Sequence, residues 1–312
     1  MELRRLARGS IGIVAFLLLW EVVPRSGWVD TQFAPPLSVV IGTAVALLRE
    51  GTLLPHVIVS LWRAGMGLAV AAAVALPAGL ALAARWPRLE EDLGPLMRLL
   101  GQVNPFSLMP VFLLFFGIGE TAKIGVLAWV CLWPVLHHTV NGVHTIDADI
   151  LRSARSMGIS GPAFLFRVLL PATSQSILAG LRTGAGLVFF MLIGAEMIGT
   201  GAGLGWFMHN AGATYQVPRI YASGALIVLL GVLLHGALGA IEKLRFRPRR
   251  LFTATALFLV ALAAGAQPVL EIDRLGADAS HGPHHGCGSV DLDRVNPADL
   301  ERIGREMVEG RR

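Results

Sequence analysis

The residues with the clearest capacity for chemistry lie near the C-terminus. Three imidazoles and one thiol fall within seven positions, at His281, His284, His285 and Cys287. Together these groups are ligands for a soft or borderline transition metal such as Zn²⁺ or Cu⁺. Their spacing matches no strict zinc-finger pattern. The cluster therefore indicates either a flexible metal site or a low-complexity linker with incidental histidines.

Two further candidates lie inside apolar stretches. Glu196 is an acid at membrane depth, where an ionisable group is costly and usually faces a cavity or a bonded partner. It therefore either lines a solute pathway or binds a neighbouring helix for structure. Asn104-Pro105 and Met109-Pro110 interrupt another apolar stretch. Such interruptions either free backbone groups that bind solute or only bend the helix.

A polar segment at residues 147–171 separates two apolar stretches. Asp147 is suited to cap a short helix and Gly158 to end it. A second short helix should follow, so that Met157 and Ile159 are exposed at the bend between the two. This arrangement is either a knob that inserts into another protein's groove or an amphipathic hairpin on the inner membrane surface.

The composition is that of an integral membrane protein. Of 312 residues, 54% are hydrophobic and only 15% are charged, whereas a soluble domain carries about a quarter charged residues. The pI near 10.0 does not indicate nucleic acid binding, because the arginines flank apolar spans. Residues 268–312 hold 6 Lys+Arg against 9 Asp+Glu, whereas residues 1–267 hold 20 against 12, so the tail is a different kind of segment.

The apolar stretches predict an all-α fold, since a membrane-spanning helix needs about 20 such residues. There are seven candidate spans: Gly9–Pro24, Ala64–Ala84, Leu99–Gly119, Ile124–Ile146, Ser176–Ile198, Ile220–Ile241 and Leu251–Leu270. A short amphipathic helix is expected at Val39–Glu50. Lysine and arginine between the spans place the N-terminus and residues 147–171 in the cytoplasm and the acidic tail outside.

The polar segment resembles the cytoplasmic loop of ABC importer permeases. Their signature is Glu-Ala-Ala, three residues, Gly, nine residues and Ile-x-Leu-Pro. Here Gly158 is followed after nine residues by Val168-Leu-Leu-Pro171, and Ala154 fills the second alanine position. Arg152 and Ser153 replace the glutamate and the first alanine, which leaves the role of that acid open. The surrounding motifs are similar to the nitrate/sulfonate/taurine-type subfamily: Pro110–Lys123, Gly180–Arg182, Ala195–Glu196 and Gly203–Gly205.

The resemblance implies a six-helix permease domain at residues 1–247 that forms a homodimer in the lipid of the bacterial inner membrane. Two cytoplasmic ATPases would dock on the loops, and an extracytoplasmic binding protein would deliver a sulfonate-, nitrate- or taurine-like anion. No GxxxxGK[ST] phosphate loop occurs in the chain, so a transport subunit without ATP chemistry of its own is expected.

Two sets of residues are expected to function, the first on the basis of the resemblance and the second on the basis of the helix breaks and the acid at membrane depth. The loop residues expected to couple to the ATPase are Ala154, Met157, Gly158, Ile159, Ser160, Val168, Leu170 and Pro171. The residues expected along the pathway are Asn104, Met109 and Glu196.

The family pattern ends before the seventh predicted helix at residues 251–270 and the tail at residues 271–312. The His/Cys cluster of the tail leaves two alternatives open. One is a permease for a metal or metal chelate. The other is a metal-dependent membrane enzyme. The sequence argues against this alternative, because no HExxH-type helix or acid–base pair accompanies the cluster.

Overall fold

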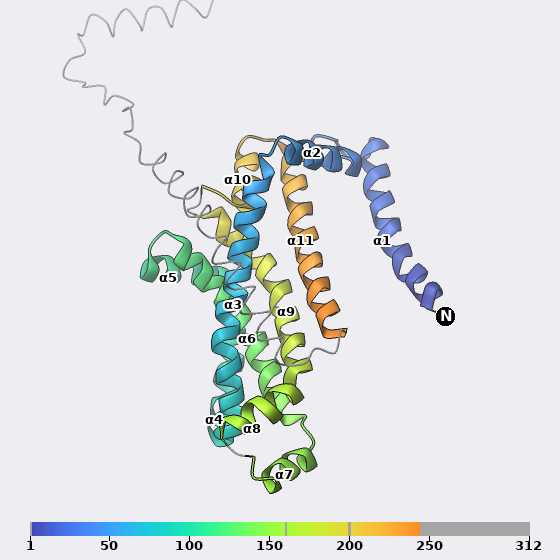
Figure 1. Cartoon of the computed structure of the whole chain (residues 1–312). Helices are drawn as coiled ribbons and strands as arrows, with labels where there is room; N and C mark the ends of the chain where they lie inside the picture. Colours follow the sequence, from blue (N-terminus) through green and yellow to red (C-terminus); the bar gives the residue numbers. More distant parts are fainter. Residues whose placement is uncertain (1, 160, 199–200, 244–312) are drawn as a thin grey trace, which may run out of the picture. The chain divides into compact units, whose positions relative to one another are not determined.

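The computed structural model describes residues 2–159, 161–198 and 201–243, all within one compact unit, and the regular structure in these ranges is helical. In chain order the helices are α1 (Glu2–Arg25), α2 (Leu37–Arg49), α3 (Leu53–Arg85), α4 (Pro87–Gly101), α5 (Pro105–Phe116), α6 (Glu120–His144), α7 (Ala148–Ser156), α8 (Pro162–Phe164), η1 (Leu165–Leu169), α9 (Leu170–Met197), α10 (Leu204–Ala213) and α11 (Val217–Lys243). Figure 1 shows α3, α6 and α9 running side by side through the centre.

Small residues let these three central helices approach closely. A Cβ atom on Gly67 of α3 would lie 2.6 Å from Leu127 Cβ on α6, and one on Gly180 of α9 would lie 2.7 Å from His138 Cβ on α6. Both distances are too short for real atoms, so alanine at either position would push two helices apart. Close packing of this kind is how membrane helices associate where the hydrophobic effect gives no driving force.

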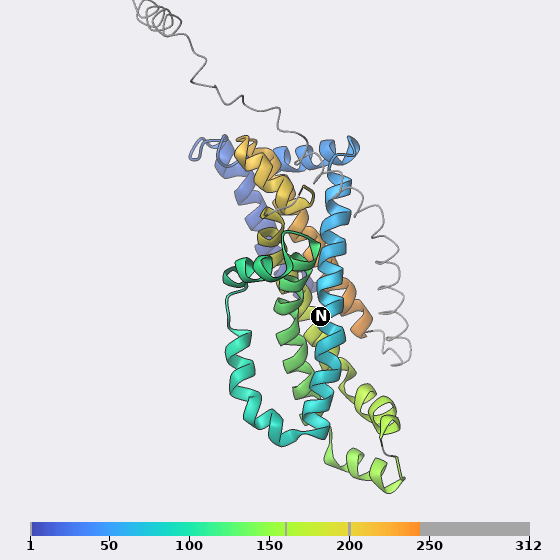
Figure 2. The same cartoon turned by 90° about the vertical axis from the view of Figure 1, so that its left-hand side faces the viewer.

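Four described helices are long and apolar enough to span a membrane: α3, α6, the continuous helix of η1 and α9 (Leu165–Met197), and α11. The pair α4 and α5 would make a fifth span, although the two helices meet at 93° (Figure 2). The predicted spans at Ile124–Ile146, Ser176–Ile198 and Ile220–Ile241 thus correspond to α6, α9 and α11, with ends shifted by a few residues. The predicted all-α membrane bundle is confirmed.

The span expected at Leu99–Gly119 is broken where proline predicts it. Pro105 begins α5, because its missing N–H would be unpaired there anyway. Pro110, by contrast, lies inside α5 without ending it. The chain also forms α10, which the sequence did not predict. The predicted helix at residues 251–270 and the tail at residues 271–312 lie outside the described residues.

Hydrogen bonds join the outer helices at one end of the bundle. The Glu21 carboxylate of α1 accepts from the backbone N–H and the hydroxyl of Ser38, both at 2.9 Å, at the start of α2. The Tyr221 hydroxyl of α11 donates to the Phe33 carbonyl at 3.3 Å. The segment between α1 and α2 is therefore fixed to α11.

Candidate functional site

The polar loop forms as its local sequence predicts. Asp147 Oδ1 accepts from the Asp149 backbone N–H at 2.9 Å, which satisfies a free donor at the start of α7. At the other end Gly158 has φ +69°, in the left-handed region that favours glycine, and the Ile159 N–H donates to the Ala154 carbonyl at 3.1 Å. The expected second short helix at Pro162 instead continues through the π-helical turn η1 into α9.

An open groove of about 740 Å³ lies between α7 and the start of α9. Predicted coupling residues that line it are Ala154, Met157, Ile159, Val168 and Pro171. Leu170 is buried instead, and Ser160 lies outside the described residues. Met157 is 70% exposed beside the groove. The loop therefore presents an apolar side chain next to a largely apolar depression.

Arg152, which stands where the signature has glutamate, does not line this groove. Its guanidinium Nη1 lies 3.4 Å from Asp149 Oδ1, one turn away on α7, and both side chains are largely exposed. An ion pair so open to water contributes little to stability. The Arg152 side chain is thus accessible at the surface of the loop.

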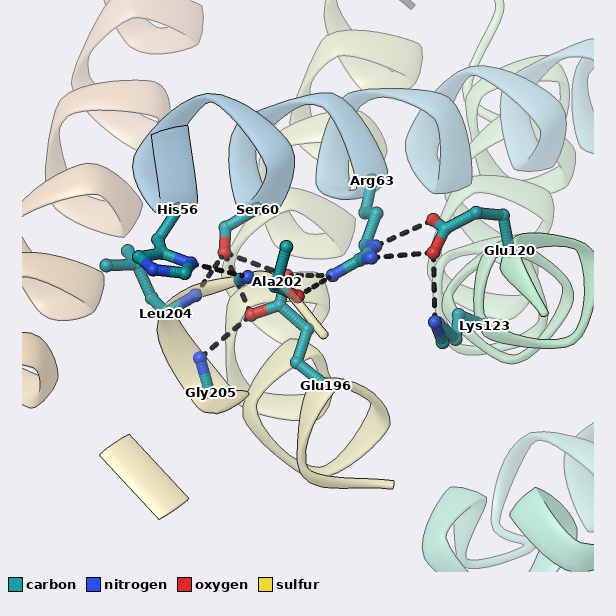
Figure 3. Close-up of polar contacts among 10 residues, drawn as sticks. His56, Ser60, Arg63, Glu120, Lys123, Glu196, Ala202, Leu204 and Gly205 are labelled. Atoms are coloured by element: carbon teal, nitrogen blue, oxygen red, sulfur yellow. Dashed lines mark hydrogen bonds and ion pairs between the residues drawn. The ribbon is translucent and has the colours of Figure 1, made fainter. Parts of the chain in front are cut away.

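A second polar group lies at the opposite end of the central helices, around Glu196 of α9 (Figure 3). Glu196 is fully buried. Its carboxylate accepts from Ser60 Oγ at 2.8 Å, from Arg63 Nη1 at 3.0 Å and from the Gly205 N–H at 2.9 Å. The acid therefore binds α3 and the start of α10.

Arg63 of α3 joins this acid to α6. It is fully buried and donates two parallel bonds to Glu120, Nε to Oε2 at 2.7 Å and Nη2 to Oε1 at 2.6 Å. Lys123 Nζ also donates to Glu120 Oε1, at 2.9 Å. Two cations thus face two anions, and such pairing is what makes burial of charge tolerable. We call Ser60, Arg63, Glu120, Lys123 and Glu196 the charge cluster.

The charge cluster also holds the chain between α9 and α10. Arg63 Nη1 donates to the Ala202 carbonyl at 2.7 Å, and Ser60 Oγ accepts from the Leu204 N–H at 2.8 Å. Gly203 has φ +122°, and a Cβ there would lie 2.5 Å from the Glu196 carboxyl carbon. Only glycine fits this turn against the carboxylate, so three helices and one turn are fixed at a single point.

The three predicted pathway residues have different surroundings. Glu196 belongs to the charge cluster. Asn104 is exposed at the break between α4 and α5, where its side chain caps α5 by accepting from the Phe106 N–H at 3.0 Å. Met109 is buried in the main hydrophobic core.

Sequence reasoning missed four members of the charge cluster, namely Ser60, Arg63, Glu120 and Lys123. Arg63 stands directly before the predicted span Ala64–Ala84, whereas α3 begins ten residues earlier at Leu53, so Arg63 lies inside the helix. The apolar residues on both sides of Arg63 were the available signal. In the ranges that the structure describes, no group of three or more His, Cys, Asp or Glu residues is placed to hold a metal. The predicted ligands His281, His284, His285 and Cys287 lie outside those ranges.

Residues 14–247 match the family of binding-protein-dependent transport system inner membrane components. The chain belongs to this family. It is 33% identical over 238 residues to the putative aliphatic sulfonates transport permease protein SsuC of Escherichia coli, covering 76% of this chain and 89% of the relative. It is 31% identical over 240 residues to the taurine transport system permease protein TauC of the same organism, covering 75% and 87%.

A third relative is the bicarbonate transport system permease protein CmpB of Synechocystis sp., 28% identical over 256 residues, which cover 77% of this chain and 90% of the relative. The apolar helices and the family together identify the chain as a multi-pass permease subunit of an ABC importer. The prediction of a transport subunit rather than an enzyme agrees with this family.

Proposed function

We propose that the chain imports a small oxyanion of the sulfonate, taurine or bicarbonate class, working as a homodimer with two cytoplasmic ATPases and an extracytoplasmic binding protein. The names of the three relatives support this cargo class. The observation that carries the partner proposal is the exposed Met157 beside an apolar groove. An apolar side chain presented at a bend is suited to insertion into another protein's surface.

The position of the loop supports a role in coupling. Residues 147–171 connect the end of α6 to the start of α9, and these two helices pack closely together and against α3. A displacement of the loop by an ATPase would therefore tilt tightly packed helices together rather than bend a single one. The proposed mechanism is alternating access, in which nucleotide-dependent closure of the ATPases biases the bundle between two states. The proposed orientation has the N-terminus and the loop in the cytoplasm.

The three predicted pathway residues have different roles under this proposal. The Glu196 carboxylate already accepts bonds from Ser60, Arg63 and Gly205, and its charge would repel an anion. We therefore propose that Glu196 positions α3 and α10 rather than touching cargo. Asn104 is exposed at a helix break, where amide and backbone groups are available to solute. Met109, buried near that break, would pack behind the pathway.

The test is ATP-driven uptake by the complete importer. The chain would be reconstituted in proteoliposomes with the ATPase and the binding protein encoded by its own organism. Labelled taurine, methanesulfonate and bicarbonate would be offered in turn, with a zinc chelate as the competing class. We expect accumulation of at least one anion that requires ATP and the binding protein. Accumulation of the zinc chelate alone would contradict the anion proposal.

A separate proposal concerns the tail, where His281, His284, His285 and Cys287 would bind Zn²⁺ or Cu⁺. The observation in favour is the chemistry of the four ligands within seven residues. Metal content measured on purified chain should show about one ion per chain, lost on replacement of His284 and His285 by alanine. Uptake measured without residues 271–312 then shows whether the tail affects transport. Equal metal content in both proteins would remove this proposal.

A further inference from the structure

Two tryptophans of α6 have indole N–H donors for which the described residues supply no acceptor. Trp129 and Trp133 lie one helical turn apart, with ring centroids 5.1 Å apart and planes inclined by 77°. Trp133 is 8% exposed. Both Nε1 atoms are buried, and nothing in the described part of the chain accepts a hydrogen bond from either. Buried donors are normally paired, so two unpaired ones on the same helix face call for an explanation.

Burying the two unpaired indole N–H groups costs free energy, so a role of the tryptophans in filling space alone is a poor explanation. A buried donor without an acceptor loses its hydration and gains nothing in return, and the membrane interior supplies no water to replace it. Phenylalanine would fill similar space without this penalty. Trp20 shows the usual arrangement, since its Nε1 donates to the Pro35 carbonyl at 3.2 Å. The pair on α6 lacks any such acceptor among the described residues.

The two indoles face the broken helix pair. Gly125, Trp129 and Trp133 follow one another at four-residue spacing and so share a face of α6. At one end of this face a Cβ on Gly125 would lie 2.9 Å from the Phe112 ring of α5. At the other end Trp133 lies against Gly101, the last residue of α4, whose added Cβ would be 3.4 Å from the Trp133 Cβ. Trp129 therefore falls level with the break between α4 and α5.

The helices that cover the indoles are the least anchored in this part of the bundle. The structure shows no buried residue in α4 and only Met109 in α5, whereas α3 buries thirteen residues. The two helices meet at 93°, and the break between them leaves Asn104 exposed. Separation of this pair from α6 would withdraw Met109 as the one fully buried side chain of the described pair, and would open both indole N–H groups to the space beside the break.

The chemistry of the opened face suits an oxyanion. Sulfonate, carboxylate and bicarbonate oxygens accept hydrogen bonds, and two neighbouring N–H groups can share one anion. A transport site must bind strongly enough to admit its solute and weakly enough to release it. Neutral indole donors meet this need better than a fixed cation would. One turn further along α6 lies His137, whose imidazole can also donate a hydrogen bond, so donors continue along this face.

We propose that the indole N–H groups of Trp129 and Trp133 form a transient, low-affinity oxyanion site, occupied when α4 and α5 move away from α6. The inference rests on the proposed anion import and adds the residues that contact the cargo within the membrane. It differs from two other roles for the pair. A structural pair would direct an indole N–H at the neighbouring ring, and a cation site would use the ring faces.

Replacement by phenylalanine separates these roles, because it keeps the ring contact and removes only the donor. In the reconstituted importer at saturating loaded binding protein, the double variant Trp129→Phe/Trp133→Phe should take up anion about tenfold more slowly, as expected for the loss of hydrogen bonds to a charged group. ATPase activity stimulated by the binding protein should be retained. Trp86→Phe, at an exposed tryptophan, is the matched control and should change neither rate.

Unchanged uptake in the double variant would overturn the proposal, and so would an equal fall in uptake and ATPase activity, which indicates damaged structure or coupling. A second measurement does not need transport. Chain labelled with 5-fluorotryptophan should show fluorine resonances of positions 129 and 133 that shift with millimolar methanesulfonate. A shift with tetramethylammonium instead, or with neither ion, would overturn the site. If wild type imports none of the three anions, the proposed function fails, and the fluorine titration alone decides the indole site.

Discussion

The two ends of the central helices differ in how their side chains are buried and paired. At one end the charge cluster joins α3, α6 and α9, and its Arg63 and Glu196 side chains are fully buried and bonded to each other. At the other end the loop presents Met157 to solvent beside a groove. The first region completes its interactions within one chain, whereas the second exposes an apolar side chain at the proposed ATPase contact. Substitutions in the first should therefore lower the free energy of unfolding, and those in the second should lower binding.

The largest expected effect is on stability, from Arg63→Leu. The substitution leaves the fully buried Glu196 without its cation and leaves Glu120 with Lys123 alone, and breaking a buried ion pair in this way costs about 3–5 kcal/mol. Chemical unfolding in detergent micelles would measure the loss. Arg25→Leu is the matched control, because it breaks a short ion pair with Glu21 that is open to solvent. Equal unfolding midpoints for the two variants would show that the charge cluster is not a stabilising element.

A smaller loss of stability is expected from Gly203→Ala. The residue has φ +122°, and the added methyl would meet the Glu196 carboxylate at 2.5 Å, so strain and steric overlap should together cost about 2–3 kcal/mol. Gly27→Ala is the control, because Gly27 also has a positive φ, +77°, but no atom lies within 4 Å of its added methyl. The difference between the two variants in the same unfolding assay measures the carboxylate contact together with the greater backbone strain at φ +122°. A larger loss for Gly27→Ala would contradict the described turn.

Sequence reasoning succeeded where the deciding interactions are local. The hydrogen bonds that cap α7 at Asp147 and around Gly158 join residues only two and five positions apart, so their pattern is readable in the chain itself. The apolar windows likewise predicted α6, α9 and α11, because a spanning helix must hide its backbone from lipid. The break before Pro105 follows from the ring and missing N–H of that one residue.

Sequence reasoning failed where the deciding contact joins residues that are far apart in the sequence. Arg63 and Glu196 are 133 positions apart, and no periodicity in either helix indicates that they meet. The sequence singles out Glu196 as a costly acid, yet the predicted span Ala64–Ala84 begins one residue too late to include its partner Arg63. The continuation of α8 through η1 into α9 was also missed, since Gly161 and Pro162 resemble the start of a separate short helix.

Met157 tests the exposed loop, at the end of the central helices opposite to the charge cluster. Met157→Asp places a charge where the proposed ATPase contact needs an apolar side chain, and we expect at least a tenfold loss of ATPase recovered with the chain, about 1.4 kcal/mol of binding. Because Met157 is 70% exposed, the unfolding midpoint should stay unchanged. Met157→Leu keeps the apolar contact and should recover ATPase as wild type does. A fall in stability together with recovery would place Met157 in the fold rather than in the interface.

The smallest overall effect is expected at Arg152. Its ion pair with Asp149 is long at 3.4 Å and 77% and 82% exposed at its two side chains, so Arg152→Ala should change stability by less than about 0.5 kcal/mol. Any larger effect of the substitution must therefore come from an interaction of Arg152 with a partner protein. Arg152→Glu supplies the acid of the family signature, and comparison of the two variants in ATPase recovery separates the loss of a cation from the gain of an anion. If alanine is neutral and glutamate lowers recovery, the ATPase surface facing Arg152 is acidic. If both are neutral, the apolar bend at Met157 is sufficient for docking and the charge at position 152 is free to vary.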